Sequence, residues 1–276
     1  MLKTLMVGID GSEYSRHAVA LGIDWAKRFD ALLVGLGIID QPGLCGYEAV
    51  PLGGGVFKSM LDEVRLKHAT TVVEQALEDF SIRCAEAGVA SKPLEVVGDP
   101  VQSLSVEAQR YDLILLGKRT YFHLTGDDTH TVDQLLKAPP RPVVSVPRQS
   151  NQGDSVVIAY DGSMQATRAV QAFCVSGLAA VAKAIYVVTL GAESVAAHRI
   201  ADRAVEYLSF HDIKAKPHVI TESGDTSARL AKAFEDLNAC LGVMGCYGQS
   251  AIREFFVGSV TRSMLEKSTI PLFIYQ

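Results

Sequence analysis

The stretch Met244-Gly245-Cys246-Tyr247-Gly248, followed after nine residues by Gly258-Ser259-Val260-Thr261, is the most informative part of this chain. The short apolar run before it, 239–244, predicts a buried strand, and the residues after it, 260–267, predict a helix. Glycines at the end of a strand let the backbone approach an anion closely, and a helix amino terminus offers unpaired N–H groups and a partial positive charge. The spacing therefore predicts a phosphate-binding loop between a strand and a helix.

The chain also repeats itself at a period close to half its length. Leu5-Met6-Val7-Gly8-Ile9-Asp10-Gly11-Ser12 recurs as Val156-Val157-Ile158-Ala159-Tyr160-Asp161-Gly162-Ser163. Both halves close with an apolar run that follows a proline, 143–146 and 272–275. A period of this length indicates duplication of one domain, and 276 residues is a length at which two domains are expected.

Together these residues resemble the ATP-binding signature of the universal stress protein family, and the resemblance covers the whole chain in two copies. It implies an α/β fold with two tandem, doubly wound, five-stranded parallel-sheet domains of the Rossmann-like, adenine nucleotide alpha hydrolase-like type. We expect domains at residues 1–148 and 154–276, joined by the polar linker Asn151-Gln152-Gly153-Asp154. The motif match implies nucleotide-binding residues in the second domain only: Asp161, Gly162, Ser163, Leu190, Met244, Gly245, Gly248, Gly258, Ser259 and Val260.

The order of the apolar runs supports the same fold. In the first half we expect strands at 5–9, 31–39, 94–97, 113–116 and 143–146, and helices at 15–29, 60–87, after Pro100 and near 132–137. Strands that alternate with helices predict a parallel sheet with right-handed crossovers and helices on both faces. Ligands of such sheets bind at the carboxyl ends of the strands, where the strand order reverses. The family resemblance implies that the strands ending at Asp161 and Gly245 are neighbours, so these two residues are expected to face one crevice.

Two of the candidate positions have a structural as well as a functional interpretation. Asp161-Gly162-Ser163 suits a turn with a helix amino cap as well as contact with a nucleotide. Cys246 lies near a predicted helix amino end, where a thiol can gain thiolate character, or it simply fills the loop as a small residue.

The first half departs from the motif. Its residues at the positions of Gly245, Gly248, Gly258 and Ser259 are Gly117, Thr120, His130 and Thr131. Side chains in place of glycines narrow the cradle and restrict its backbone, and Asp127 and Asp128 add two carboxylates that repel phosphate. These changes predict that the first half has lost nucleotide binding. It also carries a longer glycine-rich stretch, 41–59, which is expected to be a loop.

Composition excludes several classes of function. The net charge is −5 with no basic cluster, which argues against nucleic-acid binding. The five cysteines are scattered and form no C-x-x-C pair, so neither a disulfide framework nor a zinc site is expected. The amino terminus has no apolar signal segment, and the apolar stretch 169–190 is better explained as a helix and a strand than as a membrane span. We expect a cytoplasmic protein without membrane contact.

The leading functional hypothesis is a stress-response or regulatory protein that binds ATP, or ADP or AMP, with or without Mg²⁺, in its second domain. Hydrolysis is expected to be slow at most, because the motif supplies phosphate donors but no evident base, and no catalytic or metal-ligating residue is predicted. The alternatives are a ligand-independent scaffold that acts through protein contacts and a nucleotide-dependent adenylating enzyme. For the latter, the sequence has no S-G-G-x-D-S loop, P-loop or G-x-G-x-x-G motif.

The terminal strands predict an assembly. An apolar strand at the end of a sheet leaves an open edge unless it is paired. We expect 143–146 to lie beside 272–275, which makes an intramolecular pseudo-dimer, and a further homodimer through other surfaces remains open.

Overall fold

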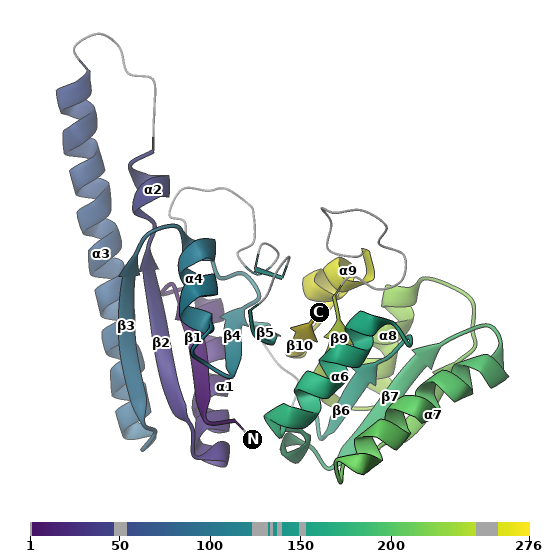
Figure 1. The fold of residues 1–276 in the computed structure, drawn as a ribbon. Coiled ribbons are helices and arrows are strands. Elements are labelled where there is room, and N and C mark those ends of the chain that lie inside the picture. Colours follow the sequence, from purple (N-terminus) through teal and green to yellow (C-terminus); the bar gives the residue numbers. More distant parts are fainter. Residues whose placement is uncertain are drawn as a thin grey trace. The chain divides into compact units, whose positions relative to one another are not determined.

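The computed structural model describes residues 2–46, 54–122, 132, 135–136, 140–148, 153–246 and 259–276 (Figure 1). The chain forms two compact units, a first unit of Lys3–Leu135 and a second unit of Leu136–Gln276 that also includes Leu2. Leu2 belongs there because its backbone N–H donates to the carbonyl of Ser176 at 3.0 Å.

The first unit has a parallel sheet with the strand order β3-β2-β1-β4 in the described residues. Its strands are β1 (Thr4–Ile9), β2 (Leu32–Ile39), β3 (Ser91–Val97) and β4 (Leu113–Gly117). The connecting helices are α1 (Glu13–Phe29), α2 (Gln41–Leu44), α3 (Gly55–Glu86) and α4 (Pro100–Ala108). The central strands β1, β2 and β4 are almost wholly buried, because helices cover both faces of a doubly wound sheet.

The second unit has the strand order β5-β10-β9-β6-β7-β8. All are parallel except β5, which pairs antiparallel with β10. The strands are β5 (Val143–Val146), β6 (Ser155–Ala159), β7 (Ala184–Leu190), β8 (Lys216–Ile220), β9 (Ala239–Gly245) and β10 (Leu272–Tyr275). The helices are α6 (Met164–Ser176), the short 3₁₀ helix η1 (Leu178–Val181), α7 (Ser194–Phe210), α8 (Thr226–Asp236) and α9 (Ser259–Lys267). Strand β6 lies between β7 and β9, so the strand order reverses there.

These elements confirm the predicted α/β fold with its parallel strands. The apolar stretch 169–190 consists of parts of α6, η1 and β7, as predicted. Among the described residues, none of the helices has both the length and the apolar character that a membrane span requires.

The predicted loop at 41–59 is partly helical. Residues 41–44 form α2, which Asp40 caps by accepting from the Gly43 N–H at 2.9 Å, and α3 begins at Gly55 rather than at the predicted Met60. Residues 47–53 lie outside the described part of the chain, as do residues 133, 134 and 137 of the helix predicted near 132–137. The loop is therefore shorter than its composition predicted: the Asp40 cap starts α2, and α3 begins earlier without a side-chain cap.

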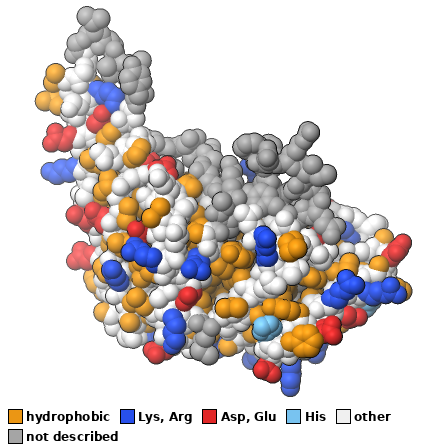
Figure 2. Space-filling view, in the orientation of Figure 1, with side chains coloured by type: hydrophobic (Ala, Val, Ile, Leu, Met, Phe, Trp, Pro, Cys, Tyr) orange, Lys and Arg blue, Asp and Glu red, His pale blue; other side chains and the backbone are white. Residues whose placement is uncertain are grey.

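The amino-terminal turns of α3 differ from the rest of that helix. Val56, Phe57, Met60 and Val64 are 63–73% exposed, whereas the positions that face the sheet begin only at Ala69. Figure 2 shows hydrophobic side chains at this end of the helix. Only the carboxyl-terminal half of α3 thus contributes to the core of the first unit.

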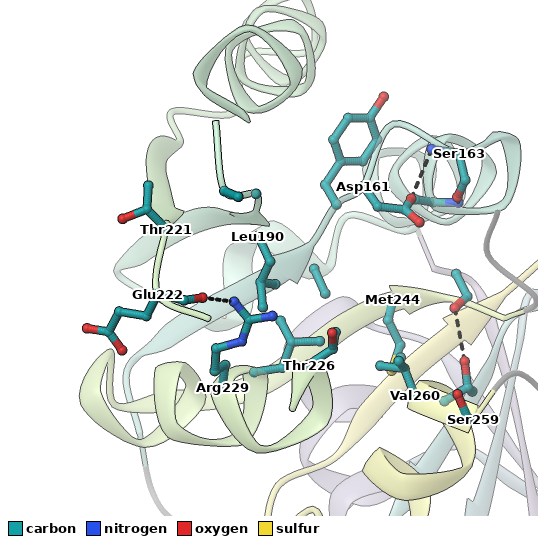
Figure 3. Close-up of a pocket in the computed structure, with 18 of the residues that line it drawn as sticks. Asp161, Ser163, Leu190, Thr221, Glu222, Thr226, Arg229, Met244, Ser259 and Val260 are labelled. Carbon is teal, nitrogen blue, oxygen red and sulfur yellow. Dashed lines mark hydrogen bonds between the residues drawn. The ribbon is translucent and has the colours of Figure 1, made fainter. Parts of the chain in front are cut away.

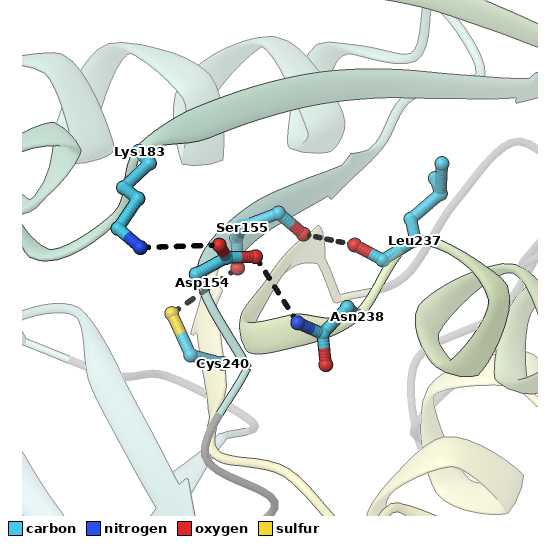
Figure 4. A network of polar contacts seen from close by, with 6 residues as sticks. All are labelled: Asp154, Ser155, Lys183, Leu237, Asn238 and Cys240. Carbon is cyan, nitrogen blue, oxygen red and sulfur yellow. Dashed lines mark hydrogen bonds and ion pairs between the residues drawn. The ribbon is translucent and has the colours of Figure 1, made fainter.

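Polar contacts fix the start of β6 in the second unit (Figure 4). The carboxylate of Asp154 accepts from the side-chain amide of Asn238 at 3.1 Å and lies 3.5 Å from the ammonium of Lys183. A Cβ on Gly153 would lie 2.2 Å from the Asn238 carbonyl oxygen, so this position requires glycine. The last two residues of the predicted linker are therefore part of the folded unit.

The predicted pairing of the two terminal strands is confirmed. Leu272, Phe273 and Ile274 of β10 lie opposite Ser145, Val144 and Val143 of β5, and all of these residues are buried. On its other side β10 pairs parallel with β9, so it is an interior strand of the second unit.

Deletion of Leu272–Gln276 is expected to unfold the second unit and cause aggregation. The truncation removes an interior strand and exposes the apolar edges of β5 and β9. Light scattering and thermal denaturation of the truncated chain test this. A truncated chain that stays soluble and monomeric with an unchanged melting temperature would contradict the pairing.

Candidate functional site

A pocket of about 470 Å³ opens in the second unit at the carboxyl ends of β6, β7 and β9 (Figure 3). It lies where the strand order reverses, which is the usual ligand position of a doubly wound sheet. Its volume falls in the range of roughly 300–1,000 Å³ that is typical of small-molecule sites. Its lining includes seven of the ten predicted residues: Asp161, Ser163, Leu190, Met244, Gly245, Ser259 and Val260.

The turn after β6 positions Asp161 and Ser163. One carboxylate oxygen of Asp161 accepts from the Ser163 N–H at 2.9 Å, and Ser163 caps α6 by accepting from the Ala166 N–H at 3.2 Å. Gly162 has φ +77°, which favours glycine, and it does not line the pocket. Ser163 is therefore a helix cap and Gly162 a turn residue. The second oxygen of Asp161 makes no hydrogen bond within the described residues and is available to a ligand.

Gly245 lines the pocket, but helix packing explains why it is a glycine. A Cβ at this position would lie 2.6 Å from the backbone N of Ala166 and 2.6 Å from the carbonyl carbon of Gln165, both in the first turn of α6. Gly117 in the first unit is in the same situation, since a Cβ there would lie 2.6 Å from the carbonyl carbon of Tyr14. Helix packing alone therefore explains why both residues are glycines, without the predicted close approach of a phosphate to their backbone.

The amino end of α9 reaches the pocket through Ser259, its first residue, and Val260. A hydrogen bond of 2.9 Å from the Ser263 hydroxyl to the Ser227 hydroxyl ties α9 to α8. Ser227 in turn donates to Asp225, and this bond is the largest cause that lowers the pKa of the Asp225 carboxyl. The first turn of α9, whose N–H groups have no partner inside the helix, is therefore held at the pocket wall. Gly248 and Gly258 lie outside the described residues.

One wall of the pocket was not predicted from the sequence. It comes from the end of β8 and the first turns of α8, and it consists of Thr221, Glu222, Ser223, Thr226, Arg229 and Leu230. The repeat of Gly98-Asp99 as Gly224-Asp225 marks the start of this helix in both halves, and it is the signal that could have located the wall.

The hypothesis of a thiolate at Cys246 is wrong. Its side chain is fully buried, and burial raises the pKa of the thiol to about 12. The thiol lies 3.8 Å from the carbonyl oxygen of Leu136. Cys246 therefore fills space next to β9, as its alternative interpretation stated.

In the described part of the first unit, the corresponding crevice is filled. Asp10 and Ile38, which match Asp161 and Leu190, line a cavity of only about 20 Å³. Phe122 is 5% exposed and lies over Gly8, whose added Cβ would be 3.0 Å from the Phe122 ring. Gly8 corresponds to Ala159, which lines the open pocket of the second unit.

Backbone N–H groups of the protein itself also donate to both carboxylate oxygens of Asp10. One oxygen accepts from the Ser12 N–H at 2.9 Å and the other from the Tyr121 N–H at 2.8 Å. Thr120, in the place of Gly248, is fully buried. The other first-half substitutions, Asp127, Asp128, His130 and Thr131, lie outside the described residues.

A doubly wound parallel sheet with a pocket at its reversal point defines a class of α/β ligand-binding proteins. The sequence model of the universal stress protein family matches residues 1–147 and 154–276. The chain therefore belongs to the universal stress protein family, in two tandem copies.

Individual relatives agree with this assignment. The chain is 23% identical over 290 residues to a universal stress protein of Synechocystis, with 100% of both chains covered. A crystal structure of a universal stress protein from Archaeoglobus fulgidus is similar with a TM-score of 0.71 at 19% identity, over 99% of this chain and 98% of that one. A functionally unknown protein from Pseudomonas aeruginosa has a TM-score of 0.62 at 17% identity, over 99% and 92%. At these identities the two structures support the fold.

Proposed function

We propose that this chain is a stress-response regulatory protein that binds one adenine nucleotide, ATP or ADP or AMP, in the pocket of its second unit. The observation that carries the proposal is that residues from both sequence motifs, Asp161 after β6 and Ser259 at the start of α9, line one open pocket. The domain of residues 154–276 then holds the nucleotide. The domain of residues 1–148 has lost nucleotide binding, because Phe122 and its neighbours fill the equivalent space.

The lining suggests how the nucleotide is held. The amino end of α9 and the Ser259 hydroxyl suit the phosphates, and the second oxygen of Asp161 suits a ribose hydroxyl. The apolar side chains of Leu190 and Met244 suit the base. The described residues contain no group of three or more side chains able to hold a metal ion, so Mg²⁺ would be held mainly by phosphate oxygens and water.

The proposed role is regulatory, with slow hydrolysis at most. Hydrolysis requires a residue that orients the attacking water. One oxygen of Asp161 already accepts from the Ser163 N–H, so this oxygen does not orient a water. We expect turnover well below the roughly 1–100 per second of kinases. A cytoplasmic location, the absence of nucleic-acid binding and an intramolecular pseudo-dimer remain predictions of the sequence.

Titration calorimetry of the full chain with ATP is expected to give a stoichiometry near one. The second unit has a pocket of about 470 Å³, whereas the equivalent space of the first unit is about 20 Å³. A stoichiometry near two would contradict the loss of binding in the first domain. The absence of any adenine-nucleotide binding would favour the scaffold alternative, and ATP–pyrophosphate exchange would favour the adenylating enzyme.

A further inference from the structure

A second cavity, of about 570 Å³, opens in the first unit between α1 and α3, beside the carboxyl end of β1. Helix α1 packs mainly against β1 and β4, whereas α3 packs mainly against β2 and β3. A groove therefore remains between the two helices. Its volume also falls in the range of roughly 300–1,000 Å³ that is typical of small-molecule sites.

The floor of this cavity is apolar. Ile9, Val19 and Phe80 line it and are only 1–3% exposed. Val72 and Ala76 extend the apolar lining along α3. Contact with such a floor is favourable for a ligand that carries an apolar group, because both surfaces lose their contact with water.

The rim, in contrast, is charged. Arg16 and Asp79 line the cavity from α1 and α3 and are exposed, and Arg83 lines it from α3 and is half-buried. Among the described residues, the side chains of Arg16 and Asp79 have no hydrogen-bond or ion-pair partner. Both charges are therefore open to a ligand from solvent.

Arg83 does not neutralise Asp79, although it lies four residues further along the same helix, a spacing at which such ion pairs form. Its Nη1 group donates instead to the backbone carbonyl oxygen of Arg16, at 3.4 Å. This contact reaches across the groove and brings the Arg83 guanidinium close to the start of the Arg16 side chain. Two guanidinium groups thus line the same end of the cavity, and neither is paired with a carboxylate in the described part of the chain.

We propose that this cavity binds a small organic monoanion, with its carboxylate between Arg16 and Arg83 and its apolar body on the floor around Phe80. A planar guanidinium matches the two oxygens of a carboxylate, and such charge-assisted hydrogen bonds are strong. The three charged residues of the rim add up to +1, and Asp79 repels a second negative charge, which disfavours polyphosphates. The site is independent of the nucleotide proposed for the second unit.

Phenylacetate is a suitable probe, because it combines one carboxylate with an apolar ring. Saturation-transfer NMR of the full chain compares it with phenylacetamide, which has nearly the same shape but no charge. Phenylacetate is expected to bind, and phenylacetamide is expected to bind about tenfold more weakly, since it lacks the charge-assisted bonds. An excess of ATP is expected to leave phenylacetate bound.

Four variants connect the binding to this cavity. Arg16→Met and Arg83→Met keep unbranched side chains without charge, and each is expected to weaken phenylacetate binding about tenfold without affecting phenylacetamide. Asp79→Asn is expected to strengthen phenylacetate binding, because it removes a like charge. Lys27→Met is the matched control: Lys27 is exposed on α1, does not line the cavity and carries the same charge. It is expected to bind phenylacetate like the parent, and melting curves show that each variant is folded.

Several outcomes would contradict the inference. A parent chain that does not bind phenylacetate, or that binds phenylacetamide as tightly, has no site for a monoanion. If Lys27→Met weakens binding as much as Arg16→Met, the overall charge of the surface is responsible. Displacement by ATP would place the probe in the second unit's pocket. Failure to bind ATP contradicts the proposed function alone, because the two sites lie in different units.

Discussion

Gly245→Val is expected to destabilise the second unit, and Gly117→Val the first unit, each by on the order of 1–3 kcal/mol. An added Cβ would lie 2.6 Å from backbone atoms of α6 at Gly245, and 2.6 Å from the backbone of α1 at Gly117. Backbone in the first turn of a capped helix cannot move aside as the end of a flexible side chain can. Thermal and denaturant unfolding of the full chain measure the loss.

The matched control is Gly55→Val. Gly55 is the first residue of α3, and an added Cβ there meets nothing within 4 Å. Its stability is expected to stay close to that of the parent. If Gly117→Val proves as stable as Gly55→Val, then helix packing does not explain the glycine, and the explanation for Gly245 fails with it.

Gly258→Val is expected to weaken ATP binding by more than about a hundredfold, which corresponds to roughly 2.7 kcal/mol, without unfolding the chain. Gly258 directly precedes Ser259, the first residue of α9 and part of the pocket lining. A β-branched side chain restricts the backbone of the loop and occupies space that the phosphates need. Gly248→Val is expected to act in the same way. Calorimetry with ATP, together with a melting curve of each variant, measures both effects.

Thr120→Val is the control for that experiment. Thr120 occupies the first-half position of Gly248, is fully buried, and has a hydroxyl without a partner among the described residues. Valine has nearly the same shape, so ATP affinity is expected to remain that of the parent. If Gly258→Val binds ATP as well as Thr120→Val, the phosphate site does not involve this loop.

Most of the fold could be predicted because it depends on local patterns. Short apolar runs such as 5–9 and 113–116 lie within a residue of the observed strands β1 and β4. Helix boundaries were less accurate: the Asp40 cap starts α2 inside the predicted loop, and α3 begins at Gly55 without a side-chain cap. The pairing of β5 with β10 was predictable as well, because two apolar runs that each end a half need a partner.

The candidate site was predicted only in part. Asp161 and Gly245 belong to contiguous motifs, and the rule for doubly wound sheets brings those motifs to one crevice. Arg229 belongs to no motif, and its place in the pocket depends on how α8 lies against the end of β7 and on the carbonyl of Glu222.

By itself, the sequence determined the duplication, the alternating strands and helices, and the motif residues, because each of these is encoded in short stretches of neighbouring residues. Only the tertiary structure decided that Phe122 fills the crevice of the first unit, that α6 requires Gly245 to lack a side chain, and that burial removes the reactivity of Cys246. The physical reason is that space, burial and hydrogen bonding at these positions depend on segments that are distant in the sequence and meet only in the folded units.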